Sequence, residues 1–172
     1  MMKANEGLLI CEMKSLGAAY GVIQHISQES LRVTEIIPTA EGAVLLVGGP
    51  VDSLVELLRF ASEVVSNRII PSLSKQVIES YLALQNPPLE GNLFIFEGRQ
   101  IGDVFEAAAR LEAAGAKPFD LRVLRGGSPR AYVLATGGAV PSFSTDGLVG
   151  QFSRIENPNE NVRKFFEIAP QR

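Results

Sequence analysis

Residues 44–53 read VLLVGGPVDS, and residues 133–142 read VLATGGAVPS. In both stretches an apolar run typical of a buried strand ends in a glycine pair and continues into residues that favour a turn. The same pattern recurring about ninety positions later indicates that one structural unit is written twice. The sequence on either side of each stretch defines that unit.

The first half of the chain predicts strands and helices in the order βαββαβ, followed by a closing helix. Strands are expected at 8–13, 31–38, 42–49 and 67–72, and helices at 16–26, 51–65 and 74–84. The first helix carries an apolar stripe at three- and four-residue spacing, formed by Leu16, Ala19, Ile23 and Ile26. In the second helix, Ser53 and Glu56 have the spacing of a capping box. We therefore expect helices that cover one face of an antiparallel sheet.

The second half predicts the same order of elements. Its strands are expected at 92–98, 119–127, 130–138 and 153–158, and its clear helices at 101–116 and 160–168. The first of these helices has an apolar stripe made of Ile101, Val104, Ala108 and Leu111. Residues 142–152 occupy the place of the capped helix but contain two glycines, so we expect a short or irregular helix there.

Matching residues recur along the whole chain at nearly constant spacing. Glu12 and Glu97 are 85 positions apart, and Gly48 and Gly137 are 89 apart. The sequence thus predicts an internal duplication with copies at 1–86 and 92–172, joined by a linker at 87–91. The expected fold class is α/β, as two tandem α+β two-layer sandwiches of βαββαβ (ferredoxin-like) type with mostly antiparallel sheets.

Composition excludes several classes of function. Of the 172 residues, 46% are hydrophobic and the net charge is −3, without a basic, aromatic-rich surface signature, so we expect no binding to nucleic acid. No apolar stretch approaches the roughly twenty residues that cross a bilayer. The apolar run near the N-terminus is also shorter than the core of a signal peptide. We expect a soluble, cytoplasmic protein.

The sequence contains few residues with catalytic or metal-binding chemistry. Cys11 and His25 are the one cysteine and the one histidine, and their positions give no zinc-ligand spacing. Cys11 is interpreted as a small apolar residue inside a strand, with a reactive thiol as the alternative. No phosphate-loop, dinucleotide-binding or hydrolase motif is present. Carboxylates such as Glu12 and Glu97 could form a dyad for acid–base catalysis, but no other feature of the sequence supports one. We expect no cofactor, no metal and no enzymatic activity.

Short motifs follow the strands of each half in the same order. In the first half, Glu12 and Lys14 end the first strand before a helix of small residues, and a Val-x-Gly-x-Val motif ends the third strand. Ile70 and Pro71 end the fourth strand. This succession resembles the bacterial microcompartment (BMC) shell domain. In the second half, the matching positions are Glu97, Arg99, Gly138 and Val140, with Ile155 and Pro158 separated by two inserted residues.

The resemblance implies a structural role. Two BMC-like domains in one chain are similar to the trimeric class of shell proteins, in which three chains form a pseudohexagonal tile with a central pore. It implies a homotrimer that lies beside other shell proteins in the shell of a cytoplasmic bacterial microcompartment. Small polar metabolites would cross the pore, and no catalytic site is implied.

The resemblance also implies which residues face the pore and the tile edge. The pore positions lie in the loop between the second and third strands of each copy: Thr39, Ala40, Glu41, Gly42, Arg125, Gly126, Gly127, Ser128 and Arg130. Lys14 corresponds to the edge lysine of the family, and Arg99 takes its place in the second copy. The alternative is that the loops are ordinary polar hairpin turns and that both cations are simply solvated.

A second class of function is compatible with the same sequence pattern. Small α/β sandwiches with tandem ferredoxin-like repeats also form oligomeric modules that sense or regulate through a bound small molecule. This alternative predicts a monomer or a small closed oligomer with one saturable ligand. The shell interpretation predicts a trimer that forms flat sheets at high concentration.

Overall fold

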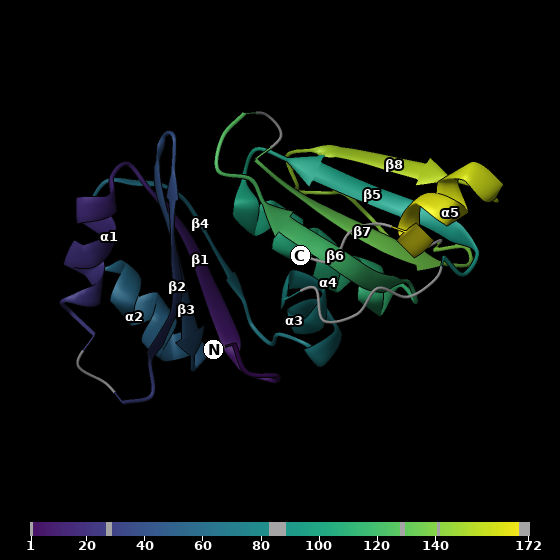
Figure 1. The fold of residues 1–172 in the computed structure, drawn as a ribbon. Helices are drawn as coiled ribbons and strands as arrows, with labels where there is room; N and C mark the ends of the chain where they lie inside the picture. Colours follow the sequence, from purple (N-terminus) through teal and green to yellow (C-terminus); the bar gives the residue numbers. More distant parts are fainter. Residues whose placement is uncertain (1, 27–28, 83–88, 128–129, 141, 169–172) are drawn as a thin grey trace. The chain divides into compact units, whose positions relative to one another are not determined.

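Two four-stranded sheets and five helices make up the residues described in the computed structural model, which are 2–26, 29–82, 89–127, 130–140 and 142–168 (Figure 1). In chain order the elements are β1 (Gly7–Met13), α1 (Leu16–Ile23), β2 (Arg32–Thr39), β3 (Gly42–Gly49), α2 (Val51–Leu58), β4 (Val64–Ile70), α3 (Lys75–Leu82), β5 (Asn92–Gly98), α4 (Ile101–Ala113), β6 (Lys117–Val123), β7 (Ala131–Gly137), β8 (Gln151–Ile155) and α5 (Glu160–Ile168). The predicted class, tandem α/β units with antiparallel sheets, is confirmed.

The two sheets have the same topology. The strand order is β2-β3-β1-β4 in the first sheet and β6-β7-β5-β8 in the second, and every neighbouring pair is antiparallel. In each sheet the first strand of the copy is central and pairs on both sides. The same order of four strands in each half is the arrangement that an internal repeat predicts.

The two halves also share their irregularities. β5 begins at Asn92, 85 positions after β1 begins at Gly7. The β2–β3 ladder shifts register between Val33 and Glu35, and the β6–β7 ladder does so between Pro118 and Asp120, again 85 positions later. Because β-bulges are specific local features, a bulge at the same place in both sheets supports duplication of one unit.

The glycine pairs in the two opening stretches end β3 and β7. Gly49 is paired with Gly7 and has a φ of 157°, while Gly137 is paired with Asn92 and has a φ of 159°. The structural equivalent of Gly137 is therefore Gly49, and the sequence pairing of Gly137 with Gly48 was one residue out of register. A Cβ at residue 49 would also lie 2.9 Å from the Ser30 backbone carbonyl oxygen, so the close approach of this backbone favours glycine there.

The chain divides into two compact units whose limits differ from those of the sequence copies. The first unit comprises Met1–Lys75 with Leu124–Ser128, and the second comprises Gln76–Val123 with Pro129–Arg172. Helix α3 closes the first sequence copy, yet all of its residues except Lys75 belong to the second unit. The copy limits 1–86 and 92–172 remain a prediction, and part of the linker proposed at 87–91 lies outside the described residues.

The core of the first unit lies between its sheet and the two helices α1 and α2. All seven residues of β1 are buried. Alternate residues of β1 and β3 face the helices and pack with their apolar side chains: Leu9, Cys11, Met13, Ala43, Leu45, Val47, Ala19, Val22, Leu54 and Leu57. Hydrophobic burial of this face fixes the register of the first sheet, because a shift by one residue would turn the apolar set away from the helices.

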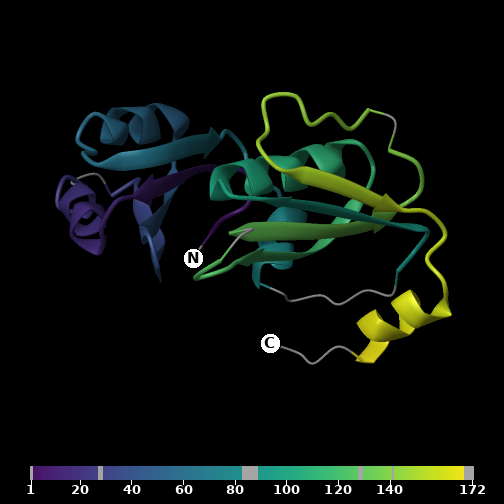
Figure 2. The same ribbon diagram turned by 90° about the horizontal axis from the view of Figure 1, so that it is seen from above.

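The second unit has helices on both faces of its sheet. Figure 2 shows α4 and α5 on opposite sides of the β5–β8 sheet. The predicted apolar stripe of α4 is confirmed, since Ile101, Val104, Ala108 and Leu111 are all fully buried. α5 packs through Val162 and Phe166 on the other face, beside Leu93 and Phe119.

The predicted capped helix at 51–65 was partly wrong. α2 ends at Leu58, its N-cap is Pro50 rather than Ser53, and that cap makes no side-chain hydrogen bond. Glu63 has a left-handed φ of 58°, and β4 begins at the next residue. The apolar residues Val64 and Val65 continued the helical pattern in the sequence, but they belong to a strand, which favours β-branched side chains.

Two further expectations need correction. Leu16 was expected on the buried face of the first helix but is 41% exposed, whereas Ala19 and Val22 of α1 are buried. Residues 142–152 were expected to include a short or irregular helix. They contain no helix: a stretch of turns and bends leads directly into β8.

The buried thiol of Cys11 makes the stability of the protein depend on pH in the alkaline range. Burial, with a smaller contribution from the Glu12 carboxylate, raises the pKa of Cys11 to about 11. The folded state therefore holds this proton more tightly than the unfolded chain does. The contribution of this thiol to the free energy of unfolding is fully present below the ordinary thiol pKa of 9.0, and it is lost as the pH rises towards about 11.

We predict that the free energy of unfolding of Cys11→Ala falls less steeply than that of the parent protein between these pH values. Urea denaturation at a series of alkaline pH values measures both slopes, and the tyrosines and lysines common to both proteins cancel in the difference. Equal slopes would contradict the buried, protonated thiol.

Candidate functional site

The first candidate pore loop is a two-residue hairpin turn. Thr39, the last residue of β2, pairs with Gly42, the first residue of β3, and Ala40 and Glu41 form the exposed tip between them. Gly42 has a φ of 148°, and a Cβ on it would collide with the backbone carbonyl oxygen of Met13. The tight connection thus projects the Glu41 carboxylate away from the sheet.

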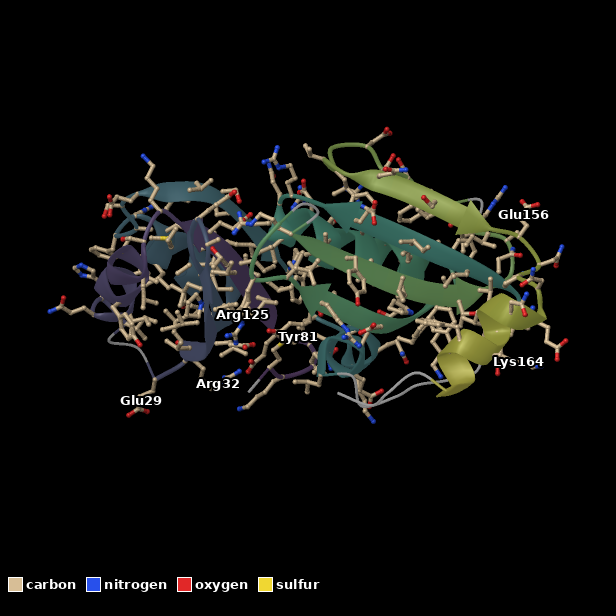
Figure 3. All side chains as sticks on the ribbon, turned by 45° about the horizontal axis from the view of Figure 1, so that its top comes forward. Glu29, Arg32, Tyr81, Arg125, Glu156 and Lys164 are labelled. Atoms are coloured by element: carbon tan, nitrogen blue, oxygen red, sulfur yellow. The ribbon has the colours of Figure 1, made fainter. Side chains whose placement is uncertain are left out.

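The second candidate loop joins β6 to β7 and is longer. Arg125, Gly126 and Gly127 are exposed, and Arg125 is labelled in Figure 3. Arg130 is half-buried, and its backbone N–H donates to the Gly98 carbonyl oxygen at 2.9 Å, which holds the end of the loop at the sheet. Ser128 lies outside the described residues. No carboxylate ion pair to Arg125 is found in the described part of the chain.

One hydrogen bond joins the two candidate loops. The backbone N–H of Ala40 donates to the Arg125 carbonyl oxygen at 3.0 Å, and residues 124–128 belong to the first compact unit together with the β2–β3 hairpin. The structure thus brings Glu41 and Arg125 into neighbouring turns. Their side chains add one negative and one positive group to this region, together with the exposed backbone of Gly126 and Gly127.

The two candidate edge residues occupy equivalent positions. Lys14 directly follows β1 and Arg99 directly follows β5, and both side chains are exposed. The backbone N–H of Lys14 donates to the Glu63 carbonyl oxygen at 2.9 Å, and Ser15 caps α1 by accepting from the Ala18 N–H at 3.0 Å. The strand-to-helix corner is therefore fixed while the lysine side chain remains accessible to a partner.

The glutamates considered as a dyad are held within separate sheets. Glu12 is buried and accepts a hydrogen bond from the Ser66 hydroxyl at 2.5 Å, so its carboxylate is bound to the neighbouring strand β4. Glu97 lies at the equivalent place in β5, opposite Tyr132 and Gln151. Each carboxylate thus belongs to the sheet of its own copy, and the dyad stays a prediction from the sequence.

The described residues offer no metal centre and no catalytic histidine arrangement. They contain no group of three or more His, Cys, Asp or Glu side chains that could hold a metal ion. His25 stacks on Phe60, with ring centroids 4.6 Å apart. Among the described segments, none of the helices has the length and apolar character needed to cross a membrane.

A partly exposed ion pair lies on the first sheet, and sequence analysis did not identify it. The Arg32 guanidinium forms an ion pair with Glu6, and this hydrogen-bonded contact holds the pKa of the Glu6 carboxyl below its usual range. The two residues are 26 positions apart, so no local motif in the sequence indicates the pair. They meet beside Gly48 of β3, because Arg32 of β2 and Glu6, the residue before β1, lie on either side of it. The pair links the edge strand to the rest of the sheet.

Comparison with solved structures shows a similar fold in a known protein. A microcompartment protein from Desulfitobacterium hafniense DCB is similar to this chain with a TM-score of 0.76 and 20% sequence identity, over 94% of this chain and 99% of that one. An unknown protein from Galdieria sulphuraria matches over 96% of this chain at 12% identity, but its TM-score of 0.34 does not indicate a shared fold. No family model and no curated protein matches the sequence. The first match establishes that this chain has the fold of the microcompartment protein.

The turn geometry predicts that alanine destabilises the protein at one loop glycine and has little effect at another. Gly42→Ala should lower the free energy of unfolding by about 1–3 kcal/mol, because the new Cβ meets backbone at a φ that L residues rarely adopt. Gly126→Ala is the matched control: nothing lies within 4 Å of its Cβ position, and the change should stay within about 0.5 kcal/mol. Chemical denaturation of both variants provides the measurement, and equal effects would contradict the described turns.

Proposed function

We propose that this protein is a structural tile of a bacterial microcompartment shell. The observation that carries the proposal is the tandem βαββαβ fold, which matches a microcompartment protein along almost the whole of both chains. Three chains would supply six equivalent sheets and so form a pseudohexagonal trimer. In this role the protein acts through its edges and a central opening, lies beside other shell proteins in the cytoplasm, and catalyses no reaction.

The duplication itself supports a closed tile. Copies at 1–86 and 92–172, with a linker at 87–91, would give each chain two equivalent wedge-shaped domains, each filling one sixth of a ring. A head-to-tail contact between equivalent surfaces generates a ring when the rotation closes, and six wedges complete such a ring in three chains. The strand order and the bulge that the two sheets share support this proposal.

The exposed hairpins are proposed to line the pore of this tile. Three copies of each loop would place Glu41 and Arg125 around the opening, with Thr39, Ala40 and Gly42 in one turn and Gly126, Gly127, Ser128 and Arg130 in the other. Rings of charged side chains and exposed backbone amides select small polar solutes. The mixture of carboxylate and guanidinium groups favours anionic or zwitterionic metabolites.

The oligomeric state tests the proposed function most simply. We predict that light scattering at two protein concentrations gives about three times the chain mass of 18.5 kDa, and that negative-stain images of concentrated protein show hexagonally packed sheets. A monomer, or a small closed oligomer that binds one saturable ligand and forms no lattice, would contradict the tile and favour a regulatory module.

The edge role of Lys14 gives a separate prediction. A lysine at a seam between tiles packs its aliphatic stem across the contact while the ammonium donates to carbonyl oxygens of the neighbour. Lys14→Ala should therefore abolish the sheets while leaving the mass of the single tile unchanged.

Lys117→Ala is the matched control, because Lys117 is also exposed but begins β6 instead of following a central strand. It should form sheets at the same concentration as the parent protein. If Lys14→Ala also forms sheets at that concentration, Lys14 has no role at the edge. Arg99→Ala tests the equivalent position of the second copy in the same way.

A further inference from the structure

The face of the second sheet that carries α5 is covered only at one end. α5 packs beside Leu93 and Ile95 of β5. Glu97 follows them at two-residue spacing, so its side chain lies on the same face, beyond the helix. The paired residues at this level form a row across all four strands, here called the outer row: Arg122, Tyr132, Glu97 and Gln151. All four are half-buried or exposed.

The outer row presents one positive and one negative group. The Arg122 Nε–H donates to the Asp120 carboxylate, at 3.1 and 3.2 Å to its two oxygens, which holds the guanidinium in place. The Arg122 side chain is 40% exposed, and its terminal nitrogens keep their N–H donors for another group. Within the described residues, the Glu97 carboxylate forms no hydrogen bond or ion pair. The two groups stand two strands apart, which corresponds to about 10 Å.

The fold itself does not require these charges. In the first sheet the same row consists of Ile37, Val44, Glu12 and Ser66. Ile37 and Val44 are buried apolar residues, and the Glu12 carboxylate accepts from the Ser66 hydroxyl. The same sheet therefore forms without an arginine or a tyrosine in this row. The charges of the outer row are available for binding.

Helix α2 carries complementary charges on its outer side. Its buried leucines face the first sheet, and Asp52, Val55 and Arg59 follow one another at helical spacing on the opposite side. Val55 is 48% exposed, and both charged residues are exposed. Neither charged side chain has a hydrogen-bonding or ionic partner in the part of the chain that the structure describes. Seven residues of helix rise about 10.5 Å, so the separation of these charges matches that of the outer row.

We propose that α2 of one chain lies across the outer row of a second copy of this chain, with the helix axis perpendicular to the strands. In this contact Asp52 meets Arg122, and Arg59 meets Glu97. The apolar Val55 packs on the aromatic ring between the two charged groups. Complementary charges at both ends fix the direction of the helix, because the reversed helix would place like charges together.

The contact joins chains head to tail. Each chain has one such helix and one such row, because residues 142–150 replace α2 in the second copy and the first sheet lacks the charges. A heterologous contact of this kind closes a ring of three when successive chains are rotated by one third of a turn. The inference rests on the proposed function in that the trimeric tile needs a contact between its chains.

Charge reversal tests the contact at Arg59 and Glu97, since Arg122 is already bonded to Asp120. Arg59→Glu and Glu97→Lys each bring like charges together, so each should raise the protein concentration at half-assembly by about tenfold or more. The double variant R59E/E97K restores opposite charges in every contact and should assemble at the concentration of the parent protein. Light scattering over a dilution series measures the assembly of all three variants.

Glu29→Lys is the matched control, because Glu29 is exposed in the first unit but lies outside α2 (Figure 3). It should assemble as the parent protein does. Recovery in the double variant separates loss of the contact from loss of the fold. The contact is overturned if the single variants assemble like the parent, or if the double variant assembles no better than they do.

The outcomes separate this inference from the tile itself. If the wild-type protein forms hexagonal sheets but neither single reversal changes its assembly, the contact is overturned and the tile stands. If the wild-type protein forms an oligomer without sheets, and the single reversals weaken it while the double variant restores it, the contact stands and the tile fails. A wild-type protein that is monomeric at every concentration overturns both.

Discussion

The structure depends on a central strand in each sheet that is paired on both sides. β1 pairs with β3 and β4, β5 pairs with β7 and β8, and β1 is buried along its whole length. Because every residue of β1 is buried, both faces of the first sheet are covered along this strand. Helices α1 and α2 supply one cover in the first unit, while α4 and α5 lie on opposite faces in the second.

The two copies share a fold but present different surfaces. The first copy has the regular helix α2, and the second has the irregular residues 142–150 at the same place. This segment is held on α4 by hydrogen bonds from Val149 N–H to the Asp103 carboxylate and from the Arg110 guanidinium to the Asp146 carbonyl oxygen. α4 is thus enclosed by its own chain, whereas α1 keeps an apolar outer face.

The sequence alone predicted the repeat of about 85 residues and the order of strands and helices in both copies, except for the helix expected within 142–152, which is absent. It did not predict the end of α2, because Val64 and Val65 continue a helical pattern that only the left-handed Glu63 interrupts. It placed Leu16 in the core, since hydrophobic periodicity does not show which apolar face the chain itself covers. Glu41 and Arg125 lie in exposed turns, as expected for loop positions. Their proposed arrangement around a shared axis would depend on several chains, so it remains a prediction.

The most direct test of the tile is a three-dimensional reconstruction of the assembled protein by electron cryomicroscopy. The account predicts threefold symmetry, six four-stranded sheets around the axis, and the β2–β3 and β6–β7 hairpins directed at a central opening. A particle with twofold symmetry, or a threefold particle with both hairpins on its outer rim, would contradict it.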